Sequence, residues 1–325
     1  MSATTIDQWP AASYERWAAT CDTLHAHTQV LGKLSAGLAP PEPELQHAAL
    51  RLTARGWETG ALPAPDGSGV LTVALDLRRH EVLVDHSGGA AERIPLTPHR
   101  SVGQVSRAVL AAVTRLGGRV TIDPTPQEVP WTVPLDEDEQ HAHYDPQHAA
   151  TYFVAATRAA RVLADFRAPF RGRCTAVNAW WGSFDLGVTL FSGAWVDPPA
   201  DDFITRNAAD AQSVALGWWP GDPRYPRAAF YAFAFPAPEE LARAEVSPSA
   251  ARFDPALGEF VLDWDDVRAA PDPHATGLEF ARSVFGRASV LGGWDEALAR
   301  SVGAEPPPLR ARRGVARTGG LSRPS

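Results

Sequence analysis

The sequence predicts an α+β fold of two lobes related by a pseudo-two-fold axis, each built as helix, antiparallel strands and helix, with a cleft between them. One observation behind this prediction is periodicity, because amphipathic helical segments frame runs of alternating, strand-like residues in each half. Another is an internal repeat that relates residues 1–123 to residues 146–303. Composition agrees, because 325 residues with 45% hydrophobic and 21% charged residues suffice for a sizeable core.

The internal repeat consists of short features that recur in the same order in both halves. Each half begins with a helix that ends in glycine and a basic residue, continues through three or four strands, and closes with a helix running into Leu-Gly-Gly. The clearest matched pairs are residues 32–33 with 172–173, residues 80–86 with 258–264, and residues 116–118 with 291–293. Any one match is short, but their shared order favours duplication of an α+β unit.

The first half, residues 1–123, is expected to hold two helices and several strands. Residues 13–36 have an apolar stripe at helical spacing, which includes Trp17, Cys21 and Leu24. The other predicted elements are a strand at 47–55, a hairpin of strands 70–77 and 81–86, a helix at 101–116 and a short strand at 120–123. Gly117-Gly118 is expected to end the second helix.

The second half, residues 146–303, follows a proline-rich acidic linker at 124–145. Its predicted elements are a helix at 146–170, a long strand or tight hairpin at 173–193, strands at 214–219, 230–235 and 260–264, and helices at 273–291 and 294–302. Residues 304–325 are rich in Pro, Arg and Gly and poor in large apolar residues, so we expect a disordered tail.

Charge and cysteine content exclude several classes of protein. The net charge of −8 offers no electrostatic footprint for nucleic acid or an anionic membrane surface. Two cysteines without a CxxC motif argue against a zinc ribbon or redox dithiol. No apolar run is long enough for a membrane span, so we expect a cytoplasmic protein, and the scarcity of Lys beside Arg suggests a bacterial source. The expected partner is a small molecule, and a homodimer is an open alternative.

The candidate site centres on residues 173–193, where polar side chains interrupt an apolar run. Burying such groups unpaired costs about 1–3 kcal/mol each, so they are expected to find partners or to do chemistry. A bulge at Gly182 would turn Asn178, Trp180, Ser183 and Asp185 onto one face. The predicted catalytic residues are His25, His47 and Asp185; the predicted substrate-binding residues are Lys33, Arg55, Asn178, Trp180, Trp181, Ser183, Trp219, His141 and Tyr144.

Three functions remain open at this point. The preferred one is a small-molecule enzyme of bacterial, specialised metabolism, which uses acid–base chemistry in an aromatic-walled cleft without a tightly bound organic cofactor. The second is a metal-dependent hydrolase or oxygenase in which His25, His47 and His141 bind a divalent transition metal. The third is a non-catalytic ligand-binding or scaffold protein. The chain lacks a phosphate-binding GxGxxG or GxxxxGK loop and a GxSxG elbow, which disfavours nucleotide-dependent and serine-hydrolase chemistry.

Several short motifs resemble an uncharacterised bacterial family that carries a domain-of-unknown-function label. They include residues 22–25, 52–56, 144–146, 181–186, 191–193, 219–221 and 257–260. The resemblance covers about residues 8–300 and implies no assigned activity. It also implies that His25, His47 and His141 match family histidines, whereas Asn178 stands where members have His and Ala211-Gln212 where they have His-Glu.

Overall fold

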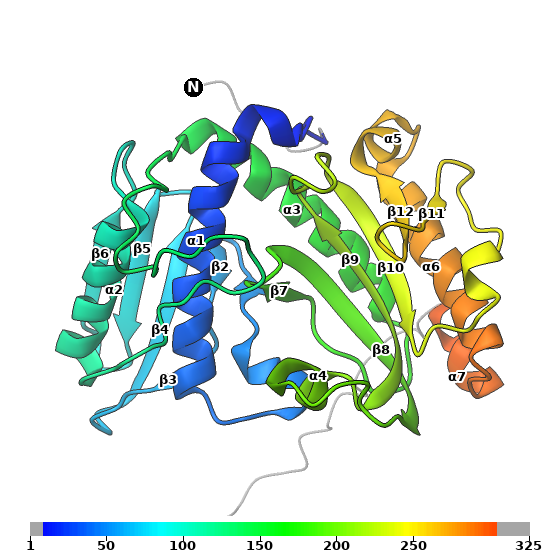
Figure 1. Cartoon of the computed structure of the whole chain (residues 1–325), viewed down its shortest axis with the longest axis horizontal. Helices are drawn as coiled ribbons and strands as arrows, with labels where there is room; N and C mark the ends of the chain where they lie inside the picture. The colour runs from blue at the N-terminus through cyan, green and yellow to red at the C-terminus, as the bar shows by residue number, and fades with distance from the viewer. Residues whose placement is uncertain (1–8, 304–325) are drawn as a thin grey trace, which may run out of the picture.

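The computed structural model describes residues 9–303, in which antiparallel sheets and helices form the predicted α+β fold (Figure 1). The helices are α1 (Tyr14–Leu38), α2 (Val102–Gly117), α3 (Pro146–Arg167), α4 (Phe203–Ala208), α5 (Trp264–Ala269), α6 (Pro273–Leu291) and α7 (Glu296–Arg300). Short 3₁₀ turns are η1 (Pro43–Ala48), η2 (Leu241–Arg243) and η3 (Ser301–Gly303). None of the helices in residues 9–303 combines the length and apolarity needed to cross a membrane.

The strands form two sheets. The first contains β1 (Arg51–Leu52), β2 (Gly56–Glu58), β4 (Val70–Asp76), β5 (Glu81–His86) and β6 (Ala91–Pro95) in that order, with β3 (Leu62–Pro63) paired to β4. The second has the order β11-β12-β10-β9-β8-β7, where β7 is Asn178–Trp180, β8 Asp185–Trp195, β9 Ala211–Trp219, β10 Ala229–Phe235, β11 Arg252–Asp254 and β12 Glu259–Asp263. All the pairings within both sheets are antiparallel.

The two sheets meet edge to edge. Leu50, just before β1, and Ala179 of β7 exchange two backbone hydrogen bonds of 3.0 and 2.9 Å. Beside this bridge, the Phe184 ring packs against His25, Trp57 and Tyr152, with ring centroids 5.1 to 5.2 Å apart. The Trp57 indole N–H donates to the Tyr152 hydroxyl at 3.0 Å. A buried aromatic cluster therefore joins the two halves of the molecule.

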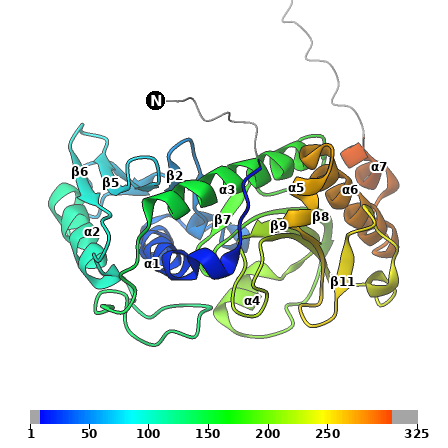
Figure 2. The same ribbon diagram turned by 90° about the horizontal axis from the view of Figure 1, so that it is seen from above.

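Each sheet is covered by helices on one face, and the two helical layers lie on opposite sides. Helices α1 and α2 contact the first sheet, whereas α3 and α6 contact the second. Seen from above, α1 and α2 lie on one side of the molecule and α3 runs along the other (Figure 2). The second sheet consequently has one face free of α3 and α6, and this face carries the candidate site.

Local sequence explains where several helices begin. Asp145 precedes Pro146, and its carboxylate accepts the backbone N–H groups of Gln147 and His148 at the start of α3. Asp272 and Pro273 begin α6 in the same way. Ser101 caps α2 through Gln104 N–H, whereas Ser13, which precedes α1, makes no such bond.

The long helices and the hairpin of β4 and β5 are confirmed, but two predicted strands are wrong. Residues 47–55 were expected to form one strand; instead η1 ends at Ala48 and only Arg51–Leu52 is extended in a sheet. The reason is a tight turn after Pro43, in which Glu44 and Leu45 have positive φ and the His47 ring accepts the Glu42 N–H. Residues 120–123 form no strand.

The segment 124–145 contains no helix or strand, which is typical of a linker. It nevertheless packs against the rest of the chain. Leu135 and Asp138 are buried, and backbone bonds run from Gly103 to Asp138 and from Val102 to His141. Both halves have the order helix, antiparallel sheet, helix; their origin by duplication stays a prediction. The tail predicted at 304–325 lies outside the described residues.

Candidate functional site

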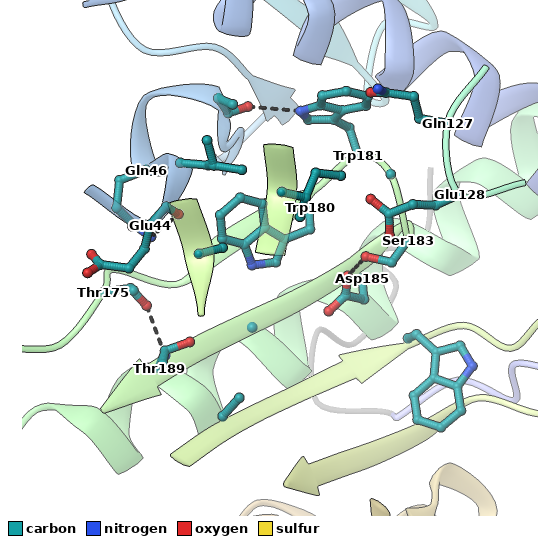
Figure 3. Close-up of a pocket in the computed structure, with 18 of the residues that line it drawn as sticks. Glu44, Gln46, Gln127, Glu128, Thr175, Trp180, Trp181, Ser183, Asp185 and Thr189 are labelled. Atoms are coloured by element: carbon teal, nitrogen blue, oxygen red, sulfur yellow. Dashed lines mark hydrogen bonds between the residues drawn. The ribbon is translucent and has the colours of Figure 1, made fainter. Parts of the chain in front are cut away.

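A pocket of about 970 Å³ opens on the free face of the second sheet. Alternate residues of each strand point into it, because successive side chains of a strand face opposite sides. From β8 to β12 these are Asp185, Gly187, Thr189, Ala215, Trp219, Tyr231, Phe233 and Glu259. The other walls come from the C-terminal part of α1, from η1 and α4, and from the segments 121–128, 222–225 and 254–257. In Figure 3, Glu128, Ser183 and Asp185 lie together on one side of the pocket, across from Glu44 and Gln46.

The hairpin of β7 and β8 supplies the most polar part of the pocket. Trp180 pairs with Asp185 across the hairpin, so these two side chains and Asn178 share a face of the sheet. The predicted bulge is therefore replaced by a turn at residues 181–184, in which Phe184 has a φ of 58°. This turn is held from α1, because the His25 ring nitrogen Nε2 lies 3.0 and 2.9 Å from the carbonyl oxygens of Trp181 and Gly182.

His25 is a support for this turn, which corrects its predicted role as acid or base. Its Nε2 must carry the proton in order to donate to the two carbonyl groups. Burial lowers the pKa of His25 to about 4, so the imidazole is neutral at pH 7. His25 is also absent from the pocket lining. It therefore fixes the shape of the site without contacting a ligand.

Asp185 is a buried carboxyl group held by two hydroxyl groups. The Ser183 hydroxyl donates to one of its oxygens and the Tyr231 hydroxyl to the other. Tyr231 reaches it by lying over Gly217 of the adjacent strand, where a Cβ atom would come within 3.0 Å of the tyrosine ring. Burial raises the pKa of Asp185, and the two hydroxyl hydrogen bonds oppose that rise.

Two of the other acidic residues that line the pocket, Glu128 and Glu259, have raised pKa values. Glu128 lies over Gly182, and its segment is tied to α1 by two 2.8 Å hydrogen bonds between Gln29 and the Gln127 backbone. Burial and the charge of Asp185 raise the pKa of Glu128. For the same two reasons the pKa of Glu259 rises to about 7, although Arg224 opposes the shift. The Glu259 carboxyl group is thus poised to exchange a proton near neutral pH.

Lys33 brings an amine to another part of the pocket. It is only 7% exposed, and its Nζ lies 5.6 Å from the centre of the Trp181 ring. The Trp181 indole is fixed by a 3.0 Å hydrogen bond from its Nε1 to the Ala48 carbonyl and by close packing on Gly32. Burial lowers the pKa of Lys33, and Asp123 acts in the opposite direction.

Aromatic side chains form much of the remaining wall, and the two Trp pairs behave differently. Trp219 faces the pocket beside Tyr225 and Tyr231, whereas Trp218 is fully buried on the opposite face of the sheet. This alternation is what a continuous strand requires. Trp180 and Trp181 both line the pocket, because the chain leaves β7 between them.

Seven of the twelve predicted site residues line the pocket: Lys33, His47, Trp180, Trp181, Ser183, Asp185 and Trp219. His47 accepts the Glu42 N–H with its Nδ1, which leaves Nε2 as the nitrogen available to a ligand. The other five do not reach the pocket. His25 has been described, and each of the remaining four has a structural contact elsewhere.

Arg55, His141 and Tyr144 are partnered away from the pocket. Arg55 lies 3.8 and 3.9 Å from Glu58 and Asp85 at the surface. His141 bonds the buried Asp138 carboxylate at 2.6 Å and packs on Trp131. The Tyr144 hydroxyl lies 2.8 Å from His80 Nδ1.

Asn178 is fully buried beneath the pocket wall. Its amide oxygen accepts from Arg51, and its amide nitrogen donates to Gln46 at 2.9 Å. Ala211-Gln212, the other departure expected from the family resemblance, lies at the start of β9. It is six residues before Gly217, which pairs with Gly187 of β8, the partner of Asn178. At the usual rise per strand residue these positions are about 20 Å apart. The two departures therefore belong to separate places.

The histidines do not form the alternative metal site in the described residues. His25 and His141 are engaged as stated above, and His47 lies at η1. Across residues 9–303, no group of three or more His, Cys, Asp and Glu side chains is placed to hold a metal ion.

Glu128, Tyr231 and Glu259 are among the pocket residues that sequence analysis missed. Tyr231 carries the one hydroxyl in the otherwise apolar strand β10, and Glu259 lies in a motif shared with the resembled family, so both had a signal. Glu128 had none, because its position depends on the fold of residues 124–145.

Comparisons with curated proteins and with solved structures give no match. A comparison with protein families does, and it covers residues 9–301, which include both sheets and every wall of the pocket. The matching family is one of unknown function, as the sequence resemblance predicted. The chain belongs to the family of unknown function DUF5996.

Proposed function

We propose that this protein is a small-molecule enzyme that performs acid–base chemistry in the pocket on the second sheet, with Asp185 as the proton-transferring group. The observation that carries the proposal is the arrangement of Asp185, whose two oxygens accept the Ser183 and Tyr231 hydroxyl groups at the pocket wall. A carboxyl group oriented from both sides is preorganised for proton transfer to or from a bound ligand.

The size and lining of the pocket support a small organic ligand. Its volume of about 970 Å³ lies within the range of about 300–1,000 Å³ that is usual for such sites. Trp180, Trp181 and Trp219 offer flat apolar surfaces, which suit a ring or another flat group. His47, which lines the pocket, is a second candidate for proton transfer through its Nε2.

The chemistry follows from how the carboxyl groups differ. Asp185 is held by hydroxyl donors, whereas Glu128 and Glu259 accept no hydrogen bond and make no ion pair of 4.0 Å or less within residues 9–303. Like charges close together resist ionising at the same time, so one carboxyl keeps its proton while another has lost it. Glu259, with a pKa of about 7, is present in both protonation states near neutral pH, so it can act there as an acid or a base.

The test compares turnover with binding. The wild-type chain and Asp185→Asn are incubated with a defined library of aromatic metabolites; binding is read by saturation-transfer NMR and conversion by mass spectrometry. We expect at least one compound that both proteins bind and only the wild type converts. Asp266→Asn, an exposed residue of α5, is the matched control and should convert it at the wild-type rate.

Two results would count against the proposal. Equal conversion by the wild type and Asp185→Asn would show that Asp185 transfers no proton. Ligands that bind in the pocket without any conversion would favour the ligand-binding alternative.

We also propose that the two halves arose by duplication. The strand neighbours support this, because β1, β2, β4 and β5 follow one another in the first sheet as β8, β9, β10 and β12 do in the second. Superposition of these four strand pairs with their helices tests it; a fit that requires a different strand pairing would refute it.

A further inference from the structure

Lys33 is the sole lysine among 325 residues, and it lies in the pocket. Its side chain is more than nine-tenths buried. No side chain or backbone group in residues 9–303 forms a hydrogen bond with its Nζ, and no carboxylate there lies within the 4.0 Å of an ion pair. Burying an amine as an unpaired cation costs free energy, so the position of Lys33 at the pocket suggests a chemical role.

Burial disfavours the protonated form of Lys33 and so lowers its pKa, whereas the charge of Asp123 at the pocket wall raises it. The Trp181 ring beside it is held rigidly by Ala48 and Gly32, so the amine is presented from a fixed surface. A desolvated lysine of this kind is the usual nucleophile toward carbonyl carbon.

The charge of the pocket argues against a simpler role in which Lys33 binds an acidic group of the substrate. Seven acidic residues line the pocket, against two basic ones, Lys33 and Arg224. Five of the seven have no basic side chain within 4.0 Å among the described residues: Asp123, Glu128, Asp185, Asp254 and Glu259. An anionic ligand would meet this negative lining, whereas an uncharged carbonyl compound would not.

We propose that Lys33 is a catalytic nucleophile that forms an iminium ion with an aldehyde or ketone substrate bound in the pocket. This inference deepens the proposed function, on which it rests, by naming the substrate class. The amine lone pair attacks the carbonyl carbon, and one N–H proton passes to the carbonyl oxygen to give a carbinolamine. A protonated carboxyl group of the pocket then gives one proton to the departing hydroxyl; water leaves, and the C=N bond forms with its positive charge on nitrogen.

The pocket is suited to this product. The iminium ion carries a positive charge that the substrate lacked, and the unpaired carboxylates of the lining stabilise it. The carboxylate left by the proton transfer can later act as a base toward the carbon next to the iminium group. The acidic lining and the amine thus serve the same reaction.

The chain permits a clean test, because Lys33 and the N-terminal amine are its two primary amines. The full chain is incubated with benzaldehyde and sodium cyanoborohydride, which reduces an iminium ion to a stable benzyl amine. Intact mass counts the benzyl groups, and peptide mapping separates Lys33 from the N-terminus. Lys33→Arg and Lys33→Met are the variants, and Nα-acetyl-lysine in solution is the reference.

We expect Lys33 to be labelled at pH 7 severalfold faster than Nα-acetyl-lysine, since a lowered pKa raises the neutral fraction of the amine. Both variants should lose this label and keep the one at the N-terminus. The pH profile of labelling in the wild type gives a second reading that does not depend on the folding of a variant.

Labelling of the N-terminus alone, or of Lys33 at the rate of Nα-acetyl-lysine, would overturn the inference. These outcomes are distinct from failure of the proposed function. If a compound is converted in an Asp185-dependent manner while Lys33 stays unlabelled, the iminium step falls and the acid–base enzyme stands.

Discussion

Replacing Gly217 by alanine tests the geometry on which the site depends. The added methyl group would lie within 3.0 Å of both the Tyr231 ring and the Leu186 carbonyl oxygen. The backbone oxygen cannot move away without disturbing the pairing of β8 with β9, so the Tyr231 ring must shift. Overpacking of this kind costs about 1–3 kcal/mol. Loss of the Tyr231 hydrogen bond to the buried Asp185 carboxyl adds about 1–3 kcal/mol.

We therefore expect Gly217→Ala to lower the free energy of unfolding by about 2–6 kcal/mol, the sum of these two effects. Urea unfolding followed by tryptophan fluorescence measures it. Gly286→Ala is the matched control, because a Cβ at this exposed position of α6 meets no atom within 4 Å. It should raise stability by about 0.5–1 kcal/mol. If Gly217→Ala behaved like Gly286→Ala, Tyr231 would not lie over Gly217 and the account of Asp185 would fail.

Two further predictions concern pH. His25 has a folded pKa of about 4, below its ordinary 6.5, so the unfolded state binds more protons and stability is lost as the pH falls from 6.5 toward 4. The loss amounts to about 3 kcal/mol, and His25→Asn should be less stable at pH 7 but show a flatter pH dependence in urea unfolding; parallel curves would contradict this. Glu259 has a folded pKa of about 7, above its ordinary 4.5, so its contribution is present below 4.5 and lost as the pH rises through 7. Glu259→Gln should therefore have a higher Tm than the wild type at pH 8 and an equal one at pH 4, and a constant difference in Tm would refute the shift.

The helices and hairpins were predictable because their signals are local. Residues 273–291 were expected to be helical from apolar spacing alone, and α6 has these bounds, with Asp272 and Pro273 at its start. The hairpin of β4 and β5 was equally clear from alternation. Prediction failed at residues 47–55, where alternation indicated a strand but a tight turn at Glu44 and Leu45 redirects the chain.

The site was predicted in part. The polar residues around Trp180 do lie at a pocket, and seven of the twelve named side chains line it. The prediction for His25 was wrong for a physical reason. A histidine near a strand that carries a carboxyl group suggests proton transfer, but the His25 ring nitrogen is already hydrogen-bonded to the carbonyl groups of Trp181 and Gly182. Sequence shows which groups can bond, and only the fold shows which bonds are already made.

The sequence by itself determined the α+β class, the long helices and most strands of the second sheet, because these follow from the residue periodicities of 3.6 and 2. Only the tertiary structure decided which strand faces meet and what lies between them. A shift of one residue in register would move Tyr231 from Asp185 to the other face of the sheet. Glu128 and Lys33 join the pocket through contacts between segments far apart in the chain, and such contacts leave no periodic trace in sequence.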